Sequence, residues 1–346
     1  MIMSRTPFRI SLFGGGTDYP VWYREHGGAV IGTTINKYCY ITFRRLPPFF
    51  EHRHRIVYSR IELPQRIDEI QHPAVRAVLG ECGVEEGVEI QHYGDLPARS
   101  GVGSSSAFTV GLLNVLRAHR GRMSSAECLA KEAIRIEQEV IQEAVGSQDQ
   151  VWAAYGGINM IAFHPDGRFD VTPVIMSSER REELQSHMLL FFTRFSRTAE
   201  TIARHKIENL LARRSQLYCM HKMAEQAMAI LQNPSRPIAE IGTLLYESWR
   251  LKKELADCVT TDAIDSMYAA AMDAGALGGK LLGAGGGGFM LIFAEPHTHE
   301  RIREALRSLI EVSFKIGSPG SRIVIYEPDD LGSDGALIRA GQTAYE

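Results

Sequence analysis

The chain has 346 residues, 45% of them hydrophobic and 23% charged, and a formal net charge of −3 at pH 7. This length and composition allow a substantial core and favour two domains. The small net charge argues against nucleic acid and anionic membranes as partners. The five cysteines show no CxxC or metal-ligand spacing, residues 1–9 lack the apolar stretch of a signal peptide, and no run of about 18 apolar residues occurs. We therefore expect a cytoplasmic protein with reduced thiols.

Apolar periodicity and turn residues predict an irregular alternation of strands and helices, which favours an α+β fold over a doubly wound parallel sheet. The glycines at 14–16 follow the first strand and indicate a tight turn or a close approach of the backbone to a ligand. We expect a loop or a hairpin at 49–55. Predicted strands cover residues 8–13, 29–45, 55–61, 88–93, 157–163, 169–174, 188–193, 289–293 and 322–326. Predicted helices cover residues 21–26, 73–82, 105–117, 124–144, 149–155, 198–231, 237–257, 261–274 and 297–309.

The polar stretch at 177–181 is a candidate domain boundary. We predict an N-terminal domain over residues 1–178 and a C-terminal domain over residues 179–330. The remaining residues, 331–346, are rich in Gly and Asp, and we expect a tail there.

The segment from Asp95 to Ala107 joins a predicted strand to a predicted helix and contains two glycines and four serines. Gly101 and Gly103 allow φ > 0 and a close approach of a ligand, and the serines that follow are good N-cap residues. Free N–H groups and the positive end of the dipole make a helix N-terminus an anion site, above all for phosphate. The alternative is an ordinary serine-rich capped turn. No Gly-Lys-Ser/Thr closes the loop, so it is not a Walker A loop.

Three glycine-rich segments lie far apart in the sequence, at 14–16, 101–103 and 283–288. Each lies beside an apolar strand. We expect these backbones to converge on one ligand, and the alternative is three tight turns with no shared purpose.

Four charged residues are candidates for a site, and each has a structural alternative. Asp149 either caps a helix or faces a cleft as a base or charge partner. Glu137 lies on a predicted helix whose acidic side chains we expect mostly to be solvated. Asp18 is either an Asx-turn residue or a ligand for substrate hydroxyls. Arg9 is either an exposed edge residue or a cation aimed into a site.

Three motifs resemble, in order and over nearly the whole chain, those of the kinase superfamily named for galactokinase, homoserine kinase, mevalonate kinase and phosphomevalonate kinase (GHMP kinases). They are TPFRISLFGGGTDYP at 6–20, LPARSGVGSSSA at 96–107 and KLLGAGGGGF at 280–289. Val102 occupies a position where Leu is usual. The Gly-Gly-Gly-Thr-Asp form of the first motif, with Gln148-Asp149-Gln150, is similar to one branch. That branch contains the D-glycero-D-manno-heptose 7-phosphate kinases and the kinase portion of fucokinases.

This resemblance implies a two-domain fold, with a ribosomal-S5-domain-2-like α/β domain followed by a ferredoxin-like α+β domain. It implies ATP and Mg²⁺ as cofactors and a small-molecule sugar phosphate as partner. It gives no role to nucleic acid or a membrane and leaves a homodimer open.

The resemblance also implies roles for single residues. Asp149 matches the catalytic carboxylate and Arg9 the cation beside it. Glu137 matches the Mg²⁺-binding glutamate, and the Mg²⁺-binding serine falls on Ser105 or Ser106. Asp18 matches the sugar-binding aspartate of galactokinases. The residues implied in nucleotide binding are Gly101, Val102, Gly103, Ser104, Ser105, Ser106 and Asn36. The residues implied in acceptor binding are Gly15, Gly16, Thr17, Asp18, Arg197, Lys280, Gly285 and Gly286.

The implied reaction is ATP-dependent phosphorylation of the anomeric hydroxyl of D-glycero-D-manno-heptose 7-phosphate to the 1,7-bisphosphate. A fucokinase-like kinase of a free sugar is the nearest alternative, and a sugar- and ATP-binding sensor without turnover is another. A phosphorylated acceptor needs a second anion site, for which Lys280, Arg197 and Arg99 are candidates. Arg194 departs from the pattern of this branch, which usually has a Gly near that position.

Overall fold

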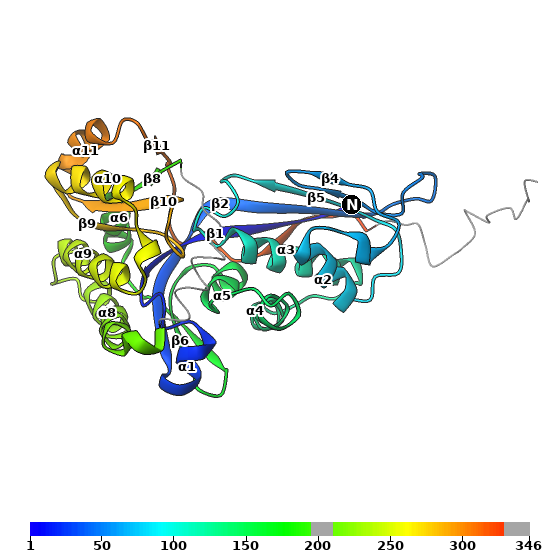
Figure 1. The fold of residues 1–346 in the computed structure, drawn as a ribbon, viewed down its shortest axis with the longest axis horizontal. Helices are drawn as coiled ribbons and strands as arrows, with labels where there is room; N and C mark the ends of the chain where they lie inside the picture. Colours follow the sequence, from blue (N-terminus) through cyan, green and yellow to red (C-terminus); the bar gives the residue numbers. More distant parts are fainter. Residues whose placement is uncertain (195–209, 329–346) are drawn as a thin grey trace, which may run out of the picture.

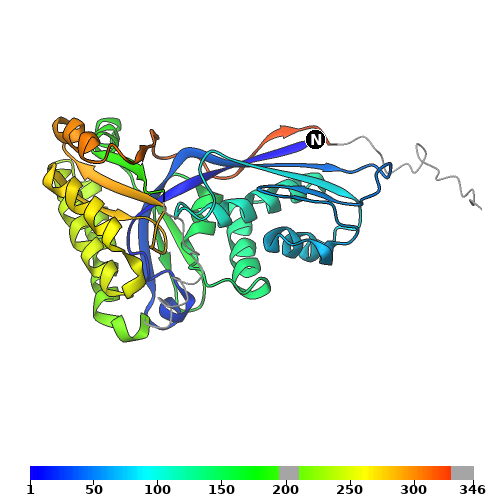
Figure 2. The same ribbon diagram turned by 45° about the horizontal axis from the view of Figure 1, so that its top comes forward.

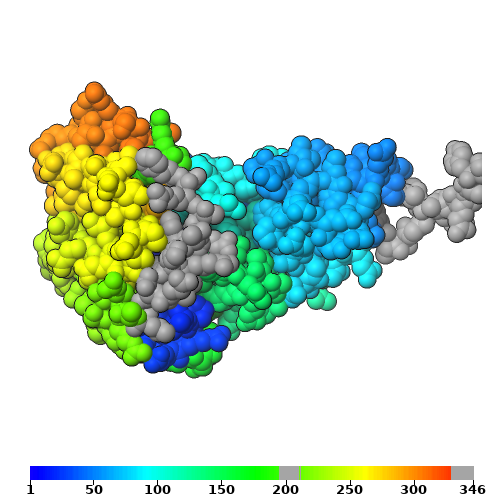
Figure 3. Space-filling model, viewed as in Figure 1, coloured from blue at the N-terminus to red at the C-terminus, as the bar shows by residue number. Residues whose placement is uncertain are grey.

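The structure is a computed structural model that describes residues 1–194 and 210–328. An eight-stranded sheet lies at one end of the molecule and a four-stranded sheet at the other, each with helices against it (Figure 1). Figure 3 shows the same elongated shape, with yellow and orange atoms gathered at one end and blue and cyan atoms towards the other. The mixture of helices and strands confirms the α+β class predicted from the sequence.

The large sheet is built around two long antiparallel strands, β1 (Ile2–Phe13) and β2 (Gly28–Arg45). The strand order is β12-β1-β2-β5-β3-β4. Because β2 is long, it pairs with β6 through residues 28–33 and with β5 through residues 39–45. The other strands are β3 (Arg55–Val57), β4 (Ile61–Glu62), β5 (Val88–Gly94), β6 (Ile158–Phe163), β7 (Phe169–Pro173) and β12 (Arg322–Tyr326).

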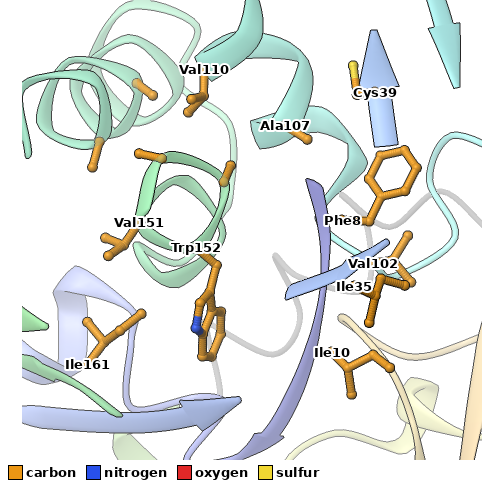
Figure 4. Packing of buried hydrophobic residues seen from close by; sticks show 14 of the residues in the cluster. Phe8, Ile10, Ile35, Cys39, Val102, Ala107, Val110, Val151, Trp152 and Ile161 are labelled. Carbon is orange, nitrogen blue, oxygen red and sulfur yellow. The ribbon is translucent and has the colours of Figure 1, made fainter. Parts of the chain in front are cut away.

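Helices α2 to α5 cover one face of the large sheet (Figures 1 and 2). Phe8 and Ile10 of β1, Val110 of α3 and Trp152 of α5 belong to one buried cluster between sheet and helices (Figure 4). Removing such large apolar side chains from water is the main force that holds the layers together. The helices of this part are α1 (Pro20–His26), α2 (Pro73–Glu81), α3 (Ser104–His119), α4 (Ala126–Arg135) and α5 (Gln148–Tyr155).

The smaller sheet is antiparallel, with the strand order β11-β8-β10-β9. Its strand β10 (Phe289–Ala294) is buried at every position, as expected for a strand covered on both faces. Within the described part of the chain, no helix is both long and apolar enough to cross a bilayer. The other strands are β8 (Met188–Phe192), β9 (Ala276–Leu281) and β11 (Ile310–Glu311). The helices are α6 (Ser178–Ser186), α8 (Arg214–Gln232), α9 (Ala239–Glu254), α10 (Asp262–Asp273) and α11 (His299–Ala305).

The chain returns to the large sheet after the smaller one is complete. β12 pairs with the first residues of β1, and Ile316 forms a bridge with Ile35. The smaller sheet is therefore inserted between two segments of the larger one. The domain ranges 1–178 and 179–330 stay a prediction, although the last strand of the second range lies in the first sheet.

The prediction of one helix over 124–144 is wrong in its second half. α4 ends at Arg135 and continues as a π-helix over Ile136–Val140, after which Gln142 has φ +60° and the chain runs as a loop to α5. A π-helix changes which residues of a helix face its neighbours and often marks a functional site. This local change places Glu137 in the interior.

Two further differences have local causes. The polar stretch at 177–181 begins α6, because Ser177 accepts a hydrogen bond from the N–H of Arg180 and caps the helix. β9 was not predicted, since glycines inside a strand weaken its sequence pattern. Of the predicted helix over 198–231, residues 198–209 lie outside the described residues.

Candidate active site

A cleft of about 930 Å³ lies where the two sheets meet. Its first-sheet side comprises residues of β1, the loop before α3, α3 and α5, and its second-sheet side comprises residues of α9, β9 and the loop after β9. The structure therefore brings together most of the residues that the sequence indicates. Those that line the cleft are Arg9, Gly15, Gly16, Asp18, Arg99, Gly101, Gly103, Ser104, Ser105, Ser106, Asp149 and Lys280.

The N-terminus of α3 opens into this cleft. Gly103 is the N-cap residue, with φ +76°, and no side chain caps the helix. Ser104, Ser105 and Ser106 form the first turn, which corrects the expectation that a serine is the cap. The Oγ of Ser104 accepts a hydrogen bond from the N–H of Arg99 at 3.0 Å. The N–H groups of this turn, at the positive end of the helix dipole, suit an anion.

Two of the glycine-rich segments are in direct contact. A Cβ atom on Gly101 would lie 2.5 Å from the carbonyl oxygen of Leu282, and one on Gly283 would lie 2.5 Å from the Cα of Gly101. Both glycines also have positive φ, +84° and +68°, so each position favours glycine on two grounds. Gly15 of the first segment lines the same cleft. The expected convergence of the three segments is therefore seen in the structure.

Asp149 and Arg9 form a bidentate ion pair on the first-sheet side. The Nε and Nη2 of Arg9 donate to the two carboxylate oxygens of Asp149 at 2.8 and 2.7 Å, and Nη1 donates to the carbonyl oxygen of Gly101. Arg9 is buried, whereas the side chain of Asp149 is 25% exposed. Arg9 is thus a cation aimed into the cleft, and it fixes a carboxylate that remains reachable.

Glu137 lies on the π-helix and has no exposed surface, which corrects the expectation of a solvated side chain. Its Oε2 accepts hydrogen bonds from the Oγ of Ser106 at 2.8 Å and from the Nε2 of Gln150 at 2.5 Å. Its Oε1 is buried and has no hydrogen-bond partner among the described residues. Desolvation raises the pKa of Glu137 to about 7, and the charge of Glu143 acts in the same direction. A buried carboxylate oxygen left without a partner requires an explanation.

Asp18 is also buried and lines the first-sheet side of the cleft. Its Oδ1 accepts a hydrogen bond from the N–H of Gly16, and its Oδ2 accepts one from the Nε2 of Gln148, both at 2.8 Å. Gly146 packs so closely that a Cβ atom there would lie 1.9 Å from Oδ2. The Oε1 of Gln148, which lines the cleft, has no hydrogen-bond partner among the described residues. The sequence gives Gln148 only as part of a motif, without a role.

Two buried lysines line the second-sheet side of the cleft. The Nζ of Lys280 donates to the carbonyl oxygen of Leu12 at 2.9 Å. The Nζ of Lys252 donates to the carbonyl oxygens of Leu281 and Gly283, both at 2.7 Å. The sequence indicates Lys280 but not Lys252. The signal for Lys252 is its position on the buried face of α9.

Asn36 and Thr17 hold the main chain and do not line the cleft. The N–H and the Oδ1 of Asn36 both bond to the main chain of Lys315. The Oγ1 of Thr17 bonds to the main chain of Gly14 and Ala29. The geometry therefore gives no support to their expected roles as ligands of the nucleoside and the acceptor.

Gly285, Gly286 and Val102 shape the loops behind the cleft. The N–H of Gly286 donates to the carbonyl oxygen of Val259 at 2.9 Å, and a Cβ atom on Gly285 would lie 2.6 Å from the same oxygen. Val102 is fully buried, and its carbonyl oxygen accepts the N–H of Arg9 at 3.0 Å. These contacts position the two loops without placing the three residues on the cleft surface.

Arg99 and Arg194 both have positive φ, +58° and +62°. This region of backbone conformation favours glycine. Arg197, the remaining predicted acceptor ligand, lies outside the described residues.

Family models match both parts of the chain. The model of the GHMP kinases N terminal domain matches residues 69–157, and the GHMP kinases C terminal model matches residues 225–311. The D-glycero-alpha-D-manno-heptose 7-phosphate kinase of Campylobacter jejuni is 30% identical over 318 residues, which cover 88% of this chain and 93% of that protein. The chain therefore belongs to the GHMP kinase family and is a phosphotransferase. Kinases of this family use ATP as the phosphate donor.

Two solved structures share the fold. A D-glycero-D-manno-heptose 1-phosphate kinase from Bacteroides thetaiotaomicron has a TM-score of 0.77 at 23% identity, covering 94% of this chain and 100% of that chain. The Lactococcus lactis galactokinase complexed with galactose has a TM-score of 0.72 at 18% identity, covering 93% of this chain and 94% of that chain. At these identities the likeness shows the fold alone.

Proposed function

We propose that the chain is an ATP- and Mg²⁺-dependent sugar kinase that phosphorylates the anomeric hydroxyl of D-glycero-D-manno-heptose 7-phosphate to give the 1,7-bisphosphate. The observation that carries the proposal is the position of Asp149, held by Arg9 beside the open N-terminus of α3. A Cβ atom on Gly103, the N-cap of α3, would lie 3.4 Å from an oxygen of Asp149. The name of the Campylobacter jejuni relative supplies the acceptor.

The loop at 101–106 is the proposed site for the β- and γ-phosphates of ATP. Its glycines let the main chain approach the phosphates, and the first turn of α3 directs N–H groups towards them. Phosphoryl transfer depends on positioning and on stabilising charge at the transferred group more than on covalent help from the protein. Arg9 adds a fixed positive charge beside this loop.

Ser106 and Glu137 are the proposed ligands of Mg²⁺. Ser106 is in contact with Glu137, whereas Ser105 is exposed. The buried Oε1 of Glu137 without a partner fits a cation. Among residues 1–194 and 210–328 no cluster of three or more His, Cys, Asp or Glu could hold a metal. Mg²⁺ usually takes one or two carboxylates and completes its shell with substrate phosphates and water, so these two side chains suit an ion that enters with ATP and neutralises its phosphates.

Asp149 is placed to receive the proton of the acceptor hydroxyl or to orient that hydroxyl. The hydroxyl oxygen bonds to the γ-phosphorus, the bond from that phosphorus to ADP breaks, and the proton passes to Asp149 or to water. An anomeric hydroxyl is more acidic than an ordinary alcohol, so a weak base is sufficient. Arg9 donates hydrogen bonds to both carboxylate oxygens of Asp149 and thereby fixes the orientation of this carboxylate relative to the acceptor hydroxyl.

Asp18 and Gln148 are the proposed ligands of the sugar hydroxyls. Asp18 lines the cleft, and hydrogen bonds from Gly16 and Gln148 are among the contacts that orient its carboxylate. The Oε1 of Gln148 is an additional acceptor for a hydroxyl proton. Gly15 leaves room for the acceptor, because a Cβ atom there would meet no atom closer than 3.8 Å.

The test is ADP release from ATP with the purified chain and a panel of acceptors. The panel contains heptose 7-phosphate, heptose 1-phosphate, free heptose, fucose and galactose. We expect the highest kcat/KM with heptose 7-phosphate, and a ³¹P NMR spectrum of the product with a second, anomeric phosphate. The Asp149→Ala variant serves as the inactive control.

Other results of the same panel would replace this proposal. Preference for fucose or another free sugar would indicate a free-sugar kinase. Preference for the 1-phosphate, as in the name of the Bacteroides thetaiotaomicron structure, would place transfer at another hydroxyl. Binding of ATP without turnover of any acceptor would favour a sensor.

A further inference from the structure

We propose that Ser11 and Gln148 together bind one hydroxyl group of the acceptor in the space beside Gly15, and that they discriminate against a sugar that lacks this hydroxyl. This inference rests on the kinase function proposed above, and it adds Ser11 to the residues that choose the acceptor. All three residues line the cleft.

The hydroxyl of Ser11 is a buried polar group. Ser11 is 6% exposed, and its Oγ has no hydrogen-bond partner among the residues that the structure describes. Because an unpaired buried hydroxyl costs stability, its presence in a cleft wall points to a partner that enters the cleft. Rotation about a single bond moves a serine hydroxyl between three staggered positions, so the group can turn towards a ligand.

Ser4 provides the contrast, because it lies on the same strand and is also buried. Its Oγ donates to the carbonyl oxygen of Gly111 at 2.9 Å, and it lies outside the lining of the cleft. The fold thus satisfies the hydroxyl of Ser4 but not that of Ser11.

The face of β1 that carries Ser11 is turned towards α5. Ser11 pairs with Gly32 of β2, and a Cβ atom on Gly32 would lie 2.8 Å from the ring of Trp152 in α5. Residues directly opposite each other in an antiparallel pair share a face of the sheet. Gln148 lies one turn before Trp152 on the same side of the helix. Ser11 therefore lies beside the N-terminal turn of α5.

The space beside Gly15 is bordered by both side chains. A Cβ atom on Gly15 would lie 3.8 Å from the Oγ of Ser11 and 3.8 Å from the Nε2 of Gln148. Apart from the chain neighbours of Gly15, no other described atom would lie within 4 Å of it. The Oε1 of Gln148 has no hydrogen-bond partner either. A sugar hydroxyl both donates and accepts, so one hydroxyl can satisfy both residues, whereas a deoxy sugar leaves them unpaired.

The experiment compares Ser11→Ala with Ser4→Ala. For Ser11→Ala we expect KM for heptose 7-phosphate to rise about 3- to 10-fold, as for loss of a neutral hydrogen bond, and KM for ATP to stay unchanged. Without ligands it should melt at or about 1–2 °C above the wild type, because it loses an unpaired buried hydroxyl. Ser4→Ala should show the reverse, an unchanged KM and a lower melting temperature. A raised KM for ATP, or a lowered melting temperature, of Ser11→Ala would overturn the proposal.

Gly15→Ala tests the space itself. Gly15 does not have positive φ, and the added Cβ meets no atom closer than 3.8 Å, so the variant should fold like the wild type. Its methyl group should occupy the place of the hydroxyl and raise KM for heptose 7-phosphate about tenfold. Gly80→Ala is the matched control, because a Cβ atom there meets nothing within 4 Å and Gly80 lies outside the cleft lining. An unchanged KM in Gly15→Ala contradicts the site.

Monodeoxy analogues of heptose 7-phosphate identify the hydroxyl. The wild type should disfavour one analogue about 10- to 100-fold in kcat/KM. In Ser11→Ala this discrimination should shrink about 3- to 10-fold, since the two changes remove the same hydrogen bond. Ser4→Ala should discriminate like the wild type. Equal discrimination by Ser11→Ala and the wild type against every analogue excludes the site.

A binding measurement separates failure of this site from failure of the proposed function. Calorimetric titration with heptose 7-phosphate, in the presence of a non-hydrolysable ATP analogue, needs no turnover. Weaker binding to Ser11→Ala than to Ser4→Ala supports the site even if the wild type transfers no phosphoryl group. Equal binding to the two variants and the wild type excludes the site and leaves the kinase function standing. Absence of binding to the wild type also excludes the site.

Discussion

The two sides of the cleft are built from different kinds of groups. The first-sheet side presents main-chain N–H groups of α3 and the carboxylates Asp149 and Asp18, each held by neighbouring donors, and Glu137 is buried beneath this side in contact with Ser106. The second-sheet side presents the ammonium groups of Lys252 and Lys280, held by carbonyl oxygens. We infer that the first side carries phosphoryl transfer and the ligands of the sugar hydroxyls, whereas the second side closes the cleft against the nucleotide loop through the contact of Gly283 with Gly101. Substitutions on the two sides should then have separable effects.

The largest effect is expected on the first side, at Asp149. Asp149→Asn removes the group that receives the proton or orients the hydroxyl while keeping its shape. Because general acid–base groups contribute about 10²–10⁴-fold, we expect kcat to fall about 10³-fold with heptose 7-phosphate and with free heptose alike. Affinity for an ATP analogue should change less than about threefold. A loss confined to one acceptor would contradict a role of Asp149 in phosphoryl transfer itself.

Glu137→Gln should lower the kinase activity and raise the melting temperature of the protein at pH 8. The substitution removes a proposed Mg²⁺ ligand. Because loss of a group that only supports a metal ligand typically costs about 10- to 100-fold, we expect kcat/KM for Mg²⁺–ATP to fall by at least that range. Measuring rates over a range of Mg²⁺ concentrations should show a higher requirement for the metal. An unchanged Mg²⁺ dependence would exclude Glu137 as a ligand.

The difference in stability between this variant and the wild type should depend on pH. The pKa of Glu137 is raised from 4.5 to about 7 in the folded protein, so between these values the folded state binds more protons than the unfolded state. The free energy of unfolding therefore falls as pH rises through this window. Without Mg²⁺, Glu137→Gln should melt a few degrees higher than the wild type at pH 8 and similarly at pH 4.5. A lower melting temperature at pH 8 would contradict this.

Gly101→Ala tests the contact that joins the two sides. Its Cβ would lie 2.5 Å from the carbonyl oxygen of Leu282, whereas Gly167 has nearly the same φ, +87° against +84°, and no atom within 4 Å. Gly167→Ala therefore measures the conformational strain alone, about 1–2 kcal/mol. We expect Gly101→Ala to be destabilised by about 2 kcal/mol more in urea unfolding. Equal losses of stability in the two variants would mean that the loops around Gly101 and Leu282 can move apart without cost.

The smallest effect is expected at Gln148. Gln148→Leu removes the donor to Asp18 and the acceptor offered to the sugar. A neutral hydrogen bond contributes about 0.5–1.5 kcal/mol, so we expect KM for heptose 7-phosphate to rise about three- to tenfold, with a small change in KM for ATP. Free heptose should be affected to the same extent, since the hydroxyls are common to both acceptors. A rise in KM for the 7-phosphate alone would instead give Gln148 a role at the phosphate group of the acceptor.

The sequence predicted those parts of the cleft whose information is local. Glycines at 101 and 103, the serines after them and Asp149 lie at the junction of a strand or loop with a helix, where turn and cap chemistry can be interpreted directly. The fold class followed from the order of periodic segments and from the family resemblance. The structure confirms the class, and the single-residue roles stay predictions.

What the sequence missed depends on tertiary context. The π-helix that carries the buried Glu137 has no signal in apolar periodicity, which indicated a continuous helix with mostly solvated acidic side chains. Lys252 resembles a surface lysine until α9 is packed against β9. The side chain of Asn36 in β2 accepts a hydrogen bond from the main-chain N–H of Lys315. The two residues are far apart in the sequence, so no short motif reveals this pairing.

The pairing of β12 with β1 affects how the chain can fold as it is made. The N–H of Glu327 donates to the carbonyl oxygen of Met1 at 2.9 Å, so the earliest and the latest described strands meet. During synthesis the edge of β1 that does not pair with β2 stays open until the residues of β12 have left the ribosome. An open strand edge invites pairing with other chains. A protein cut short before residue 322 would therefore keep the proposed catalytic groups and still be prone to aggregate.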